Sequence, residues 1–258
     1  MKQAFPFEIR SASLFALPGP AAIGHALVMA IRPSTGVLVE RRHLEAPLEL
    51  VLYHDVLCAW CYVADARLEY LRDEYGPLVR FRLRPYPLRP DTQIPDKKQR
   101  SVLARAVRRV TREPEGALVK PDLWTGRDPP SSSIPALAAL EAALVQGPSA
   151  QRDLLVAMRK AAFHEGINVA RRDVQVELAA QAGLDVSRFV DQLDDPRHAQ
   201  EVASAVEEAE AIGIRGVPAL VIGGEWLMQG CRELSEYRHV IDKYLNERVA
   251  QAPLRLMH

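Results

Sequence analysis

The first clear pattern of hydrophobic positions along the chain begins at Leu48. The run LELVLYHDV (residues 48–56) is mostly apolar and ends directly before two cysteines, as a buried strand that leads into a loop would. From residue 61 to residue 75, apolar side chains then recur at spacings of three and four with charged side chains between them. This spacing predicts an amphipathic helix, which a Gly-Pro pair ends.

The pattern changes to an alternation in VRFRLRPYPL (residues 79–88), where apolar residues and arginines take turns. A period of two is typical of a half-buried strand. Strand, helix and strand in about 37 residues form a βαβ unit, so the two strands are predicted to be parallel. The cysteines then lie at the carboxyl end of the first strand, which is where open α/β sheets place their sites.

Helical patterns dominate residues 89–204. The connection DPPSSSIPA predicts the cap of a new helix near Ser133. The first helix of this stretch, KKQRSVLARAVRRVTR, carries seven positive charges. We interpret these charges as a solvated face over an apolar stripe, rather than as a site for a phosphate-rich partner.

An α/β pattern returns after a helix predicted near residues 196–212. The segment GIRGVPALVIGGEWLMQGC contains two short strands, 219–222 and 225–229, and the dipeptide Gly223-Gly224 between them predicts a hairpin with a two-residue turn. A final helix is predicted over residues 233–249. The expected fold class is therefore α/β, with a mixed sheet flanked by helices and interrupted by an all-helical insertion.

Composition and charge narrow the classes of function. The chain has 258 residues and 48% hydrophobic content, enough for a substantial core. Its 33 basic and 33 acidic residues cancel, so no overall field favours nucleic acid or an anionic membrane as a partner. Prolines interrupt the apolar stretch within residues 1–46, which we interpret as a loose extension without an export signal. The expected location is the cytoplasm, and the oligomeric state stays open.

The chemistry centres on the motif CAWC, which contains two of only three cysteines. Cys58 precedes the predicted helix, where free backbone N–H groups and the helix dipole stabilise a thiolate. Cys61 lies one turn further on and is directed into the protein. These positions predict that Cys58 attacks a disulfide and that Cys61 resolves the mixed disulfide.

Three other roles compete with a redox pair. A zinc site would need two more ligands at a compatible spacing, and the other ligand residues are scattered. Two inert buried cysteines would be unusual at a helix N-terminus after a strand. Glutathione chemistry stays open, with the fold binding that tripeptide. We expect no bound metal or prosthetic group, and glutathione is the candidate co-substrate.

The doublet Val217-Pro218 precedes the first strand of the hairpin, where proline cannot donate to the ladder and is often cis. With CAWC and the hairpin, it resembles the thioredoxin superfamily, whose cis-proline loop faces the active-site dithiol. Four segments are similar to the DsbA-like branch that includes FrnE-type oxidoreductases and hydroxychromene carboxylate isomerases: DVLCAWCY, RPYPLRPD, AAFHEGINVARRDVQVELAAQAGLD and GIRGVPALVIGGEWLMQG. They span most of residues 48–248.

The resemblance implies a domain organisation as well as a site. It implies a thioredoxin-like domain made of residues 47–88 and 205–250, a helical insertion over 89–204, an N-terminal extension over 1–46 and a tail over 251–258. In the site it implies a nucleophile at Cys58, a resolving thiol at Cys61 and a cis peptide bond before Pro218. Val217 would offer backbone groups to an extended substrate segment.

Two comparisons with the family bear on the reaction. The isomerases and the kappa-class glutathione transferases usually have serine at the position of Cys58, so the complete pair favours dithiol redox chemistry. Ala59 replaces the proline of the family's CPWC. Because this position tunes the stability of the thiolate, the redox potential and the choice between oxidase, reductase and isomerase stay open.

Two neighbours of the pair have alternative roles. Asp55 is either a proton relay for Cys61 or a carboxylate that caps its loop. Trp60 forms an apolar surface beside the dithiol, or else packs against the insertion. His54 should point to the opposite face of the strand and is interpreted as a structural histidine.

Cys231 is the third thiol. A two-residue turn in the hairpin would return it alongside Gly216 and the proline loop. It is either a regulatory thiol that forms an alternative disulfide or an unreactive cysteine at a helix start.

The expected function is a thiol-disulfide oxidoreductase that acts on disulfides or dithiols of proteins or small molecules and is recycled by an unidentified redox partner. The alternative is a glutathione-dependent transferase or isomerase on the same fold. The third hypothesis is a non-catalytic binding module that uses the helical insertion as its partner surface. Neither nucleic acid nor a membrane is an expected partner.

Overall fold

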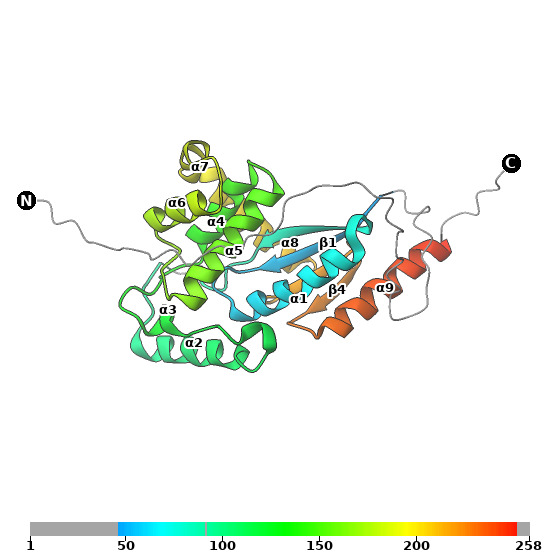
Figure 1. The fold of residues 1–258 in the computed structure, drawn as a ribbon, viewed down its shortest axis with the longest axis horizontal. Helices are drawn as coiled ribbons and strands as arrows, with labels where there is room; N and C mark the ends of the chain where they lie inside the picture. Colours follow the sequence, from blue (N-terminus) through cyan, green and yellow to red (C-terminus); the bar gives the residue numbers. More distant parts are fainter. Residues whose placement is uncertain (1–45, 91, 252–258) are drawn as a thin grey trace, which may run out of the picture. The chain divides into compact units, whose positions relative to one another are not determined.

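The computed structural model describes residues 46–90 and 92–251 (Figure 1). The predictions made for the N-terminal extension and for the C-terminal tail lie outside the described residues, except at their innermost positions. Within the described ranges, no helix is both long enough and apolar enough to cross a membrane.

The sheet has four strands in the order β2-β1-β3-β4. β1 (Leu48–His54) pairs in parallel with β2 (Val79–Pro85) and antiparallel with β3 (Ala219–Ile222). β4 (Trp226–Gln229) pairs antiparallel with β3 at the edge. The predicted mixed sheet with a parallel βαβ unit is therefore confirmed.

Helix α1 (Ala59–Tyr75) connects the two parallel strands. Its predicted apolar stripe is buried, and the helix is capped by Gly76, whose φ of 51° lies in a region that glycine adopts without strain. The 3-10 turn η1 (Gly76–Leu78) then leads into β2. The amphipathic pattern thus indicated both the extent of this helix and the face that it buries.

The two faces of the sheet are covered by different helices. Leu50 and Leu52 of β1 pack with α1 and with α9 (Leu234–Gln251), which contributes Ile241. The next residue, Tyr53, belongs to another cluster with Ala209 of α8 (Pro196–Ala211) on the opposite face. Because successive strand residues point to opposite faces, β1 is buried between two helical layers.

The segment between β2 and β3 is helical, as predicted (Figure 1). Its elements are α2 (Lys97–Val110), η2 (Pro114–Gly116), α3 (Asp122–Thr125), α4 (Ile134–Leu144), α5 (Pro148–His164), α6 (Arg172–Gln181), α7 (Val186–Leu193) and α8 (Pro196–Ala211). Most of their buried apolar side chains form one core cluster, and Val56, Leu57, Ala59 and Val63 around the start of α1 belong to the same cluster. The start of α1, with its cysteines, therefore packs on the insertion.

The predicted turn of the hairpin is wrong by one residue. Ile222 pairs with Trp226, so the loop has three residues, Gly223 to Glu225, and β4 begins one residue later than expected. Gly223 and Gly224 both have positive φ, 61° and 77°. Both a two-residue turn and this three-residue loop place residues in left-handed conformations, which glycine adopts readily. The Gly-Gly pair therefore fits either loop length.

The predicted start of α4 near Ser133 is confirmed, because Ser133 occupies the N-cap position. Ser133 precedes the helix but makes no side-chain cap; its hydroxyl accepts a hydrogen bond from the Arg89 N–H at 3.2 Å instead. The hydroxyl of Ser132 accepts from the N–H of Ile134 at 3.2 Å. The serine run therefore joins the start of α4 to the segment that follows β2.

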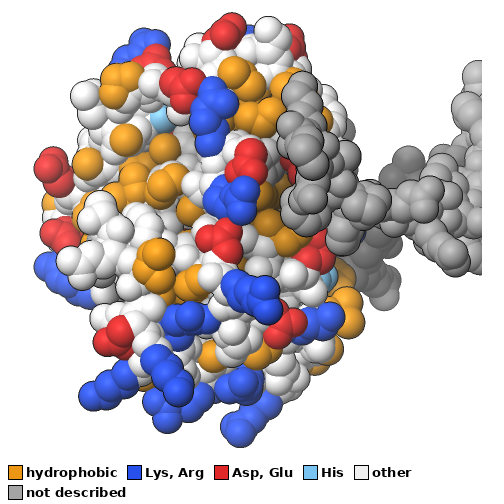
Figure 2. All heavy atoms as spheres, turned by 90° about the vertical axis from the view of Figure 1, so that its left-hand side faces the viewer, with side chains coloured by type: hydrophobic (Ala, Val, Ile, Leu, Met, Phe, Trp, Pro, Cys, Tyr) orange, Lys and Arg blue, Asp and Glu red, His pale blue; other side chains and the backbone are white. Residues whose placement is uncertain are grey.

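The basic helix α2 has its charges on the solvent side. Lys97, Lys98, Arg105, Arg108 and Arg109 are exposed, while Ala104, Val107 and Val110 are buried. In Figure 2, Lys and Arg side chains gather at the bottom of the visible face, at the height of α2 in Figure 1. The predicted solvated face is therefore confirmed, but the predicted apolar stripe is wrong at Val102 and Ala106, which are exposed.

Candidate active site

Cys58 occupies the N-cap position of α1. Its Sγ accepts a hydrogen bond from the N–H of Cys61 at 3.3 Å, so the first turn of the helix points a free backbone donor at this sulfur. Ala59, at the first helical position, keeps an N–H that proline would lack. The two cysteines are free thiols, and their N-terminal placement on the helix favours a negatively charged sulfur at Cys58.

The proline loop lies next to this sulfur. The Cys58 thiol is 3.7 Å from the carbonyl oxygen of Val217, although the two residues are 159 positions apart in the chain. The Val217-Pro218 peptide bond is cis, as the resemblance implied. The structure therefore brings together the two halves of the predicted site, CAWC and GVPA.

Cys61 is completely buried. Burial raises the pKa of its thiol well above the ordinary value, and the hydrogen bond and charge of Cys58 act in the same direction. The positive charge of Arg159 lowers it, as does a hydrogen bond from the backbone of Asp55. The two thiols thus differ in environment: one caps a helix, and the other lies inside the protein.

The Asp55 carboxylate is also completely buried. One of its oxygens accepts from the N–H of Leu57 at 2.8 Å, and the other accepts from the N–H of Leu88 at 2.7 Å. Burial raises the pKa of this carboxyl, while hydrogen bonds from Ser133, Leu88 and Leu57 lower it. Both oxygens cap backbone donors, which favours the capping role; the proton-relay role stays a prediction.

His54 and Trp60 lie on either side of the cysteine loop. The His54 side chain is buried. Burial, and to a smaller extent the positive charge of Arg159, lowers the pKa of this imidazole well below the ordinary value. The imidazole is therefore neutral at physiological pH, in line with a structural role. Trp60 is half-buried and packs against the core of the insertion, which is the packing alternative for this residue.

Arg159 of α5 is a functional candidate that the sequence pattern did not single out. Only 3% of the residue is exposed, and its Nη1 donates to Oδ2 of Asp65 on α1 at 2.6 Å. Its charge acts on His54, Asp55 and Cys61. The only sequence signal is an arginine that interrupts the apolar face of a helix, and such a signal does not say what the arginine faces.

Aromatic contacts hold α5 against the start of α1. The Tyr62 hydroxyl lies 3.1 Å from Nε2 of His164, and its ring is edge-on to Phe163 with centroids 5.9 Å apart. A groove of about 550 Å³ runs between these helices, lined in part by Tyr62, Tyr70 and Val156. The groove therefore begins at the residue that follows the resolving cysteine.

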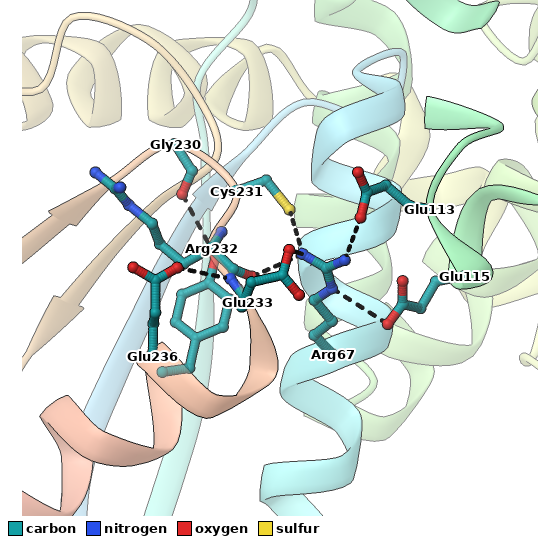
Figure 3. Close-up of polar contacts among 9 residues, drawn as sticks. Arg67, Glu113, Glu115, Gly230, Cys231, Arg232, Glu233 and Glu236 are labelled. Carbon is teal, nitrogen blue, oxygen red and sulfur yellow. Dashed lines mark hydrogen bonds and ion pairs between the residues drawn. The ribbon is translucent and has the colours of Figure 1, made fainter. Parts of the chain in front are cut away.

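Cys231 lies where β4 leads into α9. The N–H of Gly230 donates to the carbonyl of Pro218 at 2.8 Å, so the chain is still beside the proline loop one residue before the cysteine. Its Sγ lies 3.7 Å from Nη1 of Arg67, in the cluster drawn in Figure 3. The predicted turn was one residue too short, and the printed contact of the Cys231 sulfur is with Arg67 of α1; its place alongside Gly216 stays a prediction.

Arg67 is the centre of that cluster. Its guanidinium pairs with Glu113 at 2.5 Å and with Glu115 at 3.2 Å, and it donates to the carbonyl of Arg232 at 2.9 Å (Figure 3). Burial raises the pKa of the Cys231 thiol to about 11; Arg67 opposes this shift, and the surrounding glutamates add to it. Cys231 is therefore protonated at neutral pH, which favours the unreactive alternative.

Comparisons with known proteins agree with this arrangement. Residues 49–242 match the DSBA-like thioredoxin domain. A curated relative, the ClpXP adapter protein SpxH of Halalkalibacterium halodurans, is 29% identical over 188 residues, which is 70% of this chain and 60% of the relative. The chain thus spans less than two thirds of that protein's length.

Two solved structures share the fold. A putative protein disulfide isomerase from Nitrosomonas europaea superposes with a TM-score of 0.69 at 20% identity, over 78% of this chain and 98% of that one. The cytosolic disulfide reductase DsbM from Pseudomonas aeruginosa, solved with GSH, superposes with a TM-score of 0.57 at 24% identity. This match covers 80% of this chain and 100% of that one. With three quarters of its length matched by the family, the chain belongs to the DSBA-like thioredoxin domain proteins.

Proposed function

We propose that this protein is a thiol-disulfide oxidoreductase in which Cys58 attacks and Cys61 resolves. One observation carries the proposal. The Cys58 sulfur lies at the N-terminus of α1, receives the Cys61 N–H at 3.3 Å and is 3.7 Å from the Val217 carbonyl of the cis-proline loop. A sulfur in this position accepts a backbone N–H from the first helical turn and has a second thiol within one turn.

The proposed reaction uses only groups that the chain supplies. The Cys58 thiolate attacks a substrate disulfide, forms a mixed disulfide and releases the first substrate thiol. The Cys61 thiolate then attacks the Cys58 sulfur, which releases the second substrate thiol and leaves a Cys58–Cys61 disulfide. The protein dithiol is oxidised, the substrate disulfide is reduced, and both protons end on the substrate thiols; the reverse sequence oxidises a dithiol.

The proline loop supports an extended peptide as substrate. Val217 is partly exposed, and Pro218, directly before β3, has no N–H to donate. Backbone pairing with this loop would hold a substrate segment across Cys58 in any sequence context. The net direction depends on the redox partner, because thiol-disulfide exchange is reversible.

Glutathione is the proposed small-molecule co-substrate. DsbM, which shares the fold and is named a disulfide reductase, was solved with GSH. This likeness supports the choice of glutathione as a probe for the recycling step. The SpxH relative is named an adapter protein, which supports a binding role without redox turnover as the competing hypothesis.

The test compares insulin reduction and scrambled-ribonuclease reactivation for the natural chain and for Cys58→Ser, Cys61→Ser and Cys231→Ser. We expect Cys58→Ser to abolish both activities. Cys61→Ser should accumulate a mixed disulfide with the substrate, visible as a mass increase that dithiothreitol reverses. Cys231→Ser, whose thiol is protonated at neutral pH, is the matched control and should retain at least half of the activity.

Glutathione binding is measured by calorimetry on the same four proteins. Disulfide exchange that persists in Cys58→Ser would contradict the dithiol mechanism. Tight glutathione binding without disulfide exchange would favour the transferase or isomerase alternative. Binding of a protein partner that is equal in all four variants, without exchange, would favour the adapter role.

A further inference from the structure

The α1–α5 contact contains a buried cation that the ion pairs do not fully use. Arg159 is 3% exposed and pairs with Asp65 through Nη1 alone. Its Nε and Nη2 are buried and have no hydrogen-bond partner among the described residues. Burying a guanidinium with unused donors is costly, so a further negative charge near Arg159 would be strongly favoured.

The position of Arg159 relative to Cys61 follows from its partner. Asp65 comes four residues after Cys61 on α1, so their side chains share one face of the helix. The contact of Tyr62 with His164, one turn beyond Arg159 on α5, fixes the two helices against each other. The guanidinium is therefore held over the buried side of α1, where the Cys61 thiol lies.

Other groups around Cys61 do not supply a positive charge. Cys58 raises the pKa of the Cys61 thiol, and Asp55 reaches it only through its backbone. From α9, Tyr237 contributes a phenol whose own pKa is raised by burial and which is therefore neutral. His54 is neutral as well. Among the described groups that act on Cys61, Arg159 is the cation.

The resolving step needs such a charge. Cys61 must lose its proton before it attacks the Cys58 sulfur of the mixed disulfide. A new Cys58–Cys61 bond then forms, the bond from Cys58 to the substrate sulfur breaks, and the electron pair leaves on the substrate thiolate, which takes up a proton. Burial opposes the first part of this step, because it disfavours a charged Cys61.

We propose that Arg159 is a positioning residue for the resolving step, whose buried guanidinium stabilises the negative charge on Cys61 during its attack on the mixed disulfide. This inference rests on the dithiol mechanism proposed above. Asp65 has the opposite effect, because its carboxylate offsets part of the Arg159 charge. The helical insertion thereby takes part in the chemistry of the dithiol.

Two substitutions separate this electrostatic role from a structural one. Arg159→Met and Asp65→Asn both break the Arg159–Asp65 ion pair, so both loosen the α1–α5 contact. Asp65→Asn also removes the 3.7 Å contact between Asp65 and Arg152 of α5. A structural role predicts that both slow the resolving step. The electrostatic role predicts opposite shifts in the pKa of Cys61: upward in Arg159→Met, and downward in Asp65→Asn, where the guanidinium charge is no longer offset.

The experiment is a stopped-flow reaction with 5,5′-dithiobis(2-nitrobenzoate) in a Cys231→Ser background, which leaves two thiols in the chain. Attack by Cys58 releases the first chromogenic thiolate, and resolution by Cys61 releases the second. Each unit of change in the pKa of Cys61 should change the second rate roughly three- to fourfold below that pKa, because nucleophilicity partly follows basicity. The midpoint of the pH profile of that rate should move in the same direction.

We expect Arg159→Met to slow the second phase at least threefold at pH 7 and Asp65→Asn to accelerate it. If Arg159→Met does not fold, Arg159→Lys replaces it; because lysine keeps the charge, its second-phase rate should be closer to that of the parent. Asp65→Asn alone still shows whether removing the carboxylate speeds or slows the second phase. Equal rates, or a slower second phase in Asp65→Asn, would overturn the inference. A parent protein without a second phase would instead refute the dithiol mechanism itself.

Discussion

At the residue scale, the site depends on how buried polar atoms are satisfied. The Asp55 carboxylate ties the end of β1 to two backbone N–H groups, one in the cysteine loop and one after β2. From sequence, this residue could be placed before the cysteines, but its partners could not be named. Leu88 is 33 positions away, and no pattern predicts such a contact.

Replacing Asp55 by Asn should destabilise the fold. The amide presents an NH₂ group to one of the two backbone donors, which leaves that donor unpaired inside the protein, at a cost of about 1–3 kcal/mol. Urea unfolding measures this loss. Asp96→Asn is the control, because Asp96 caps α2 at an exposed position and the change should cost less than about 1 kcal/mol.

The same variant distinguishes capping from proton relay. With a capping role, Asp55→Asn lowers the free energy of unfolding and leaves the pH profile of the resolving step unchanged. A profile whose midpoint moves, in a variant of unchanged stability, would establish the relay role instead.

At the scale of elements, the sequence predicted the strands and helices well and the turns less well. β1 follows from a mostly apolar run, α1 from a spacing of three to four and β2 from a period of two, because burial imposes these patterns on a chain. The hairpin loop was predicted one residue too short. Loop length depends on where Ile222 finds its partner across the sheet, and Gly-Gly fits both lengths.

The two glycines of this loop should differ in tolerance to alanine. A Cβ on Gly223 would overlap the hydroxyl of Tyr244 from α9, whereas a Cβ on Gly224 would meet open space. Both have positive φ, so Gly224→Ala should cost about 1 kcal/mol from strain alone. Gly223→Ala should cost about 1–3 kcal/mol more.

Thermal and urea unfolding of the two single variants test this difference. Equal destabilisation would mean that Tyr244 does not constrain the loop. A Gly223→Ala/Tyr244→Phe double variant that recovers part of the loss would show that the overlap with the hydroxyl is the cause.

At the scale of the whole molecule, the sheet and the insertion are joined by buried polar groups as well as by apolar packing. Glu141 of α4 is 8% exposed and accepts a hydrogen bond from Gln151 at 3.3 Å. Burial raises the pKa of its carboxyl to about 7, although Arg84 of β2 opposes the shift. The sequence predicted a helix that starts near Ser133, but it did not indicate that a glutamate in this helix would be buried.

Glu141→Gln should reduce the pH dependence of stability. Between about pH 4.5 and pH 7 the folded protein retains a proton at Glu141 that the unfolded chain has released, so the free energy of unfolding falls as the pH rises. At pH 8 the variant should be more stable than the parent by about 2–3 kcal/mol. At pH 4 the two should be equal.

Urea unfolding from pH 4 to pH 8 measures that difference. Glu207→Gln, an exposed position on α8, is the matched control; it retains Glu141 and should keep the pH dependence of the parent. If the difference in the free energy of unfolding between Glu141→Gln and the parent is constant from pH 4 to pH 8, the Glu141 carboxyl titrates at its ordinary value.

Helix α1 is anchored to other elements at several levels along its length. Near its start, α1 contacts α5 through Tyr62 with His164 and through Asp65 with Arg159. Further along, Arg67 binds Glu113 and Glu115. At the end of the helix, Tyr75 donates to Asp242 of α9 at 2.7 Å. An incoming substrate therefore meets cysteines whose arrangement is already set. Because the site is preorganised, the free energy of substrate binding is not consumed in assembling the site. It is available for holding the substrate sulfur in line with Cys58.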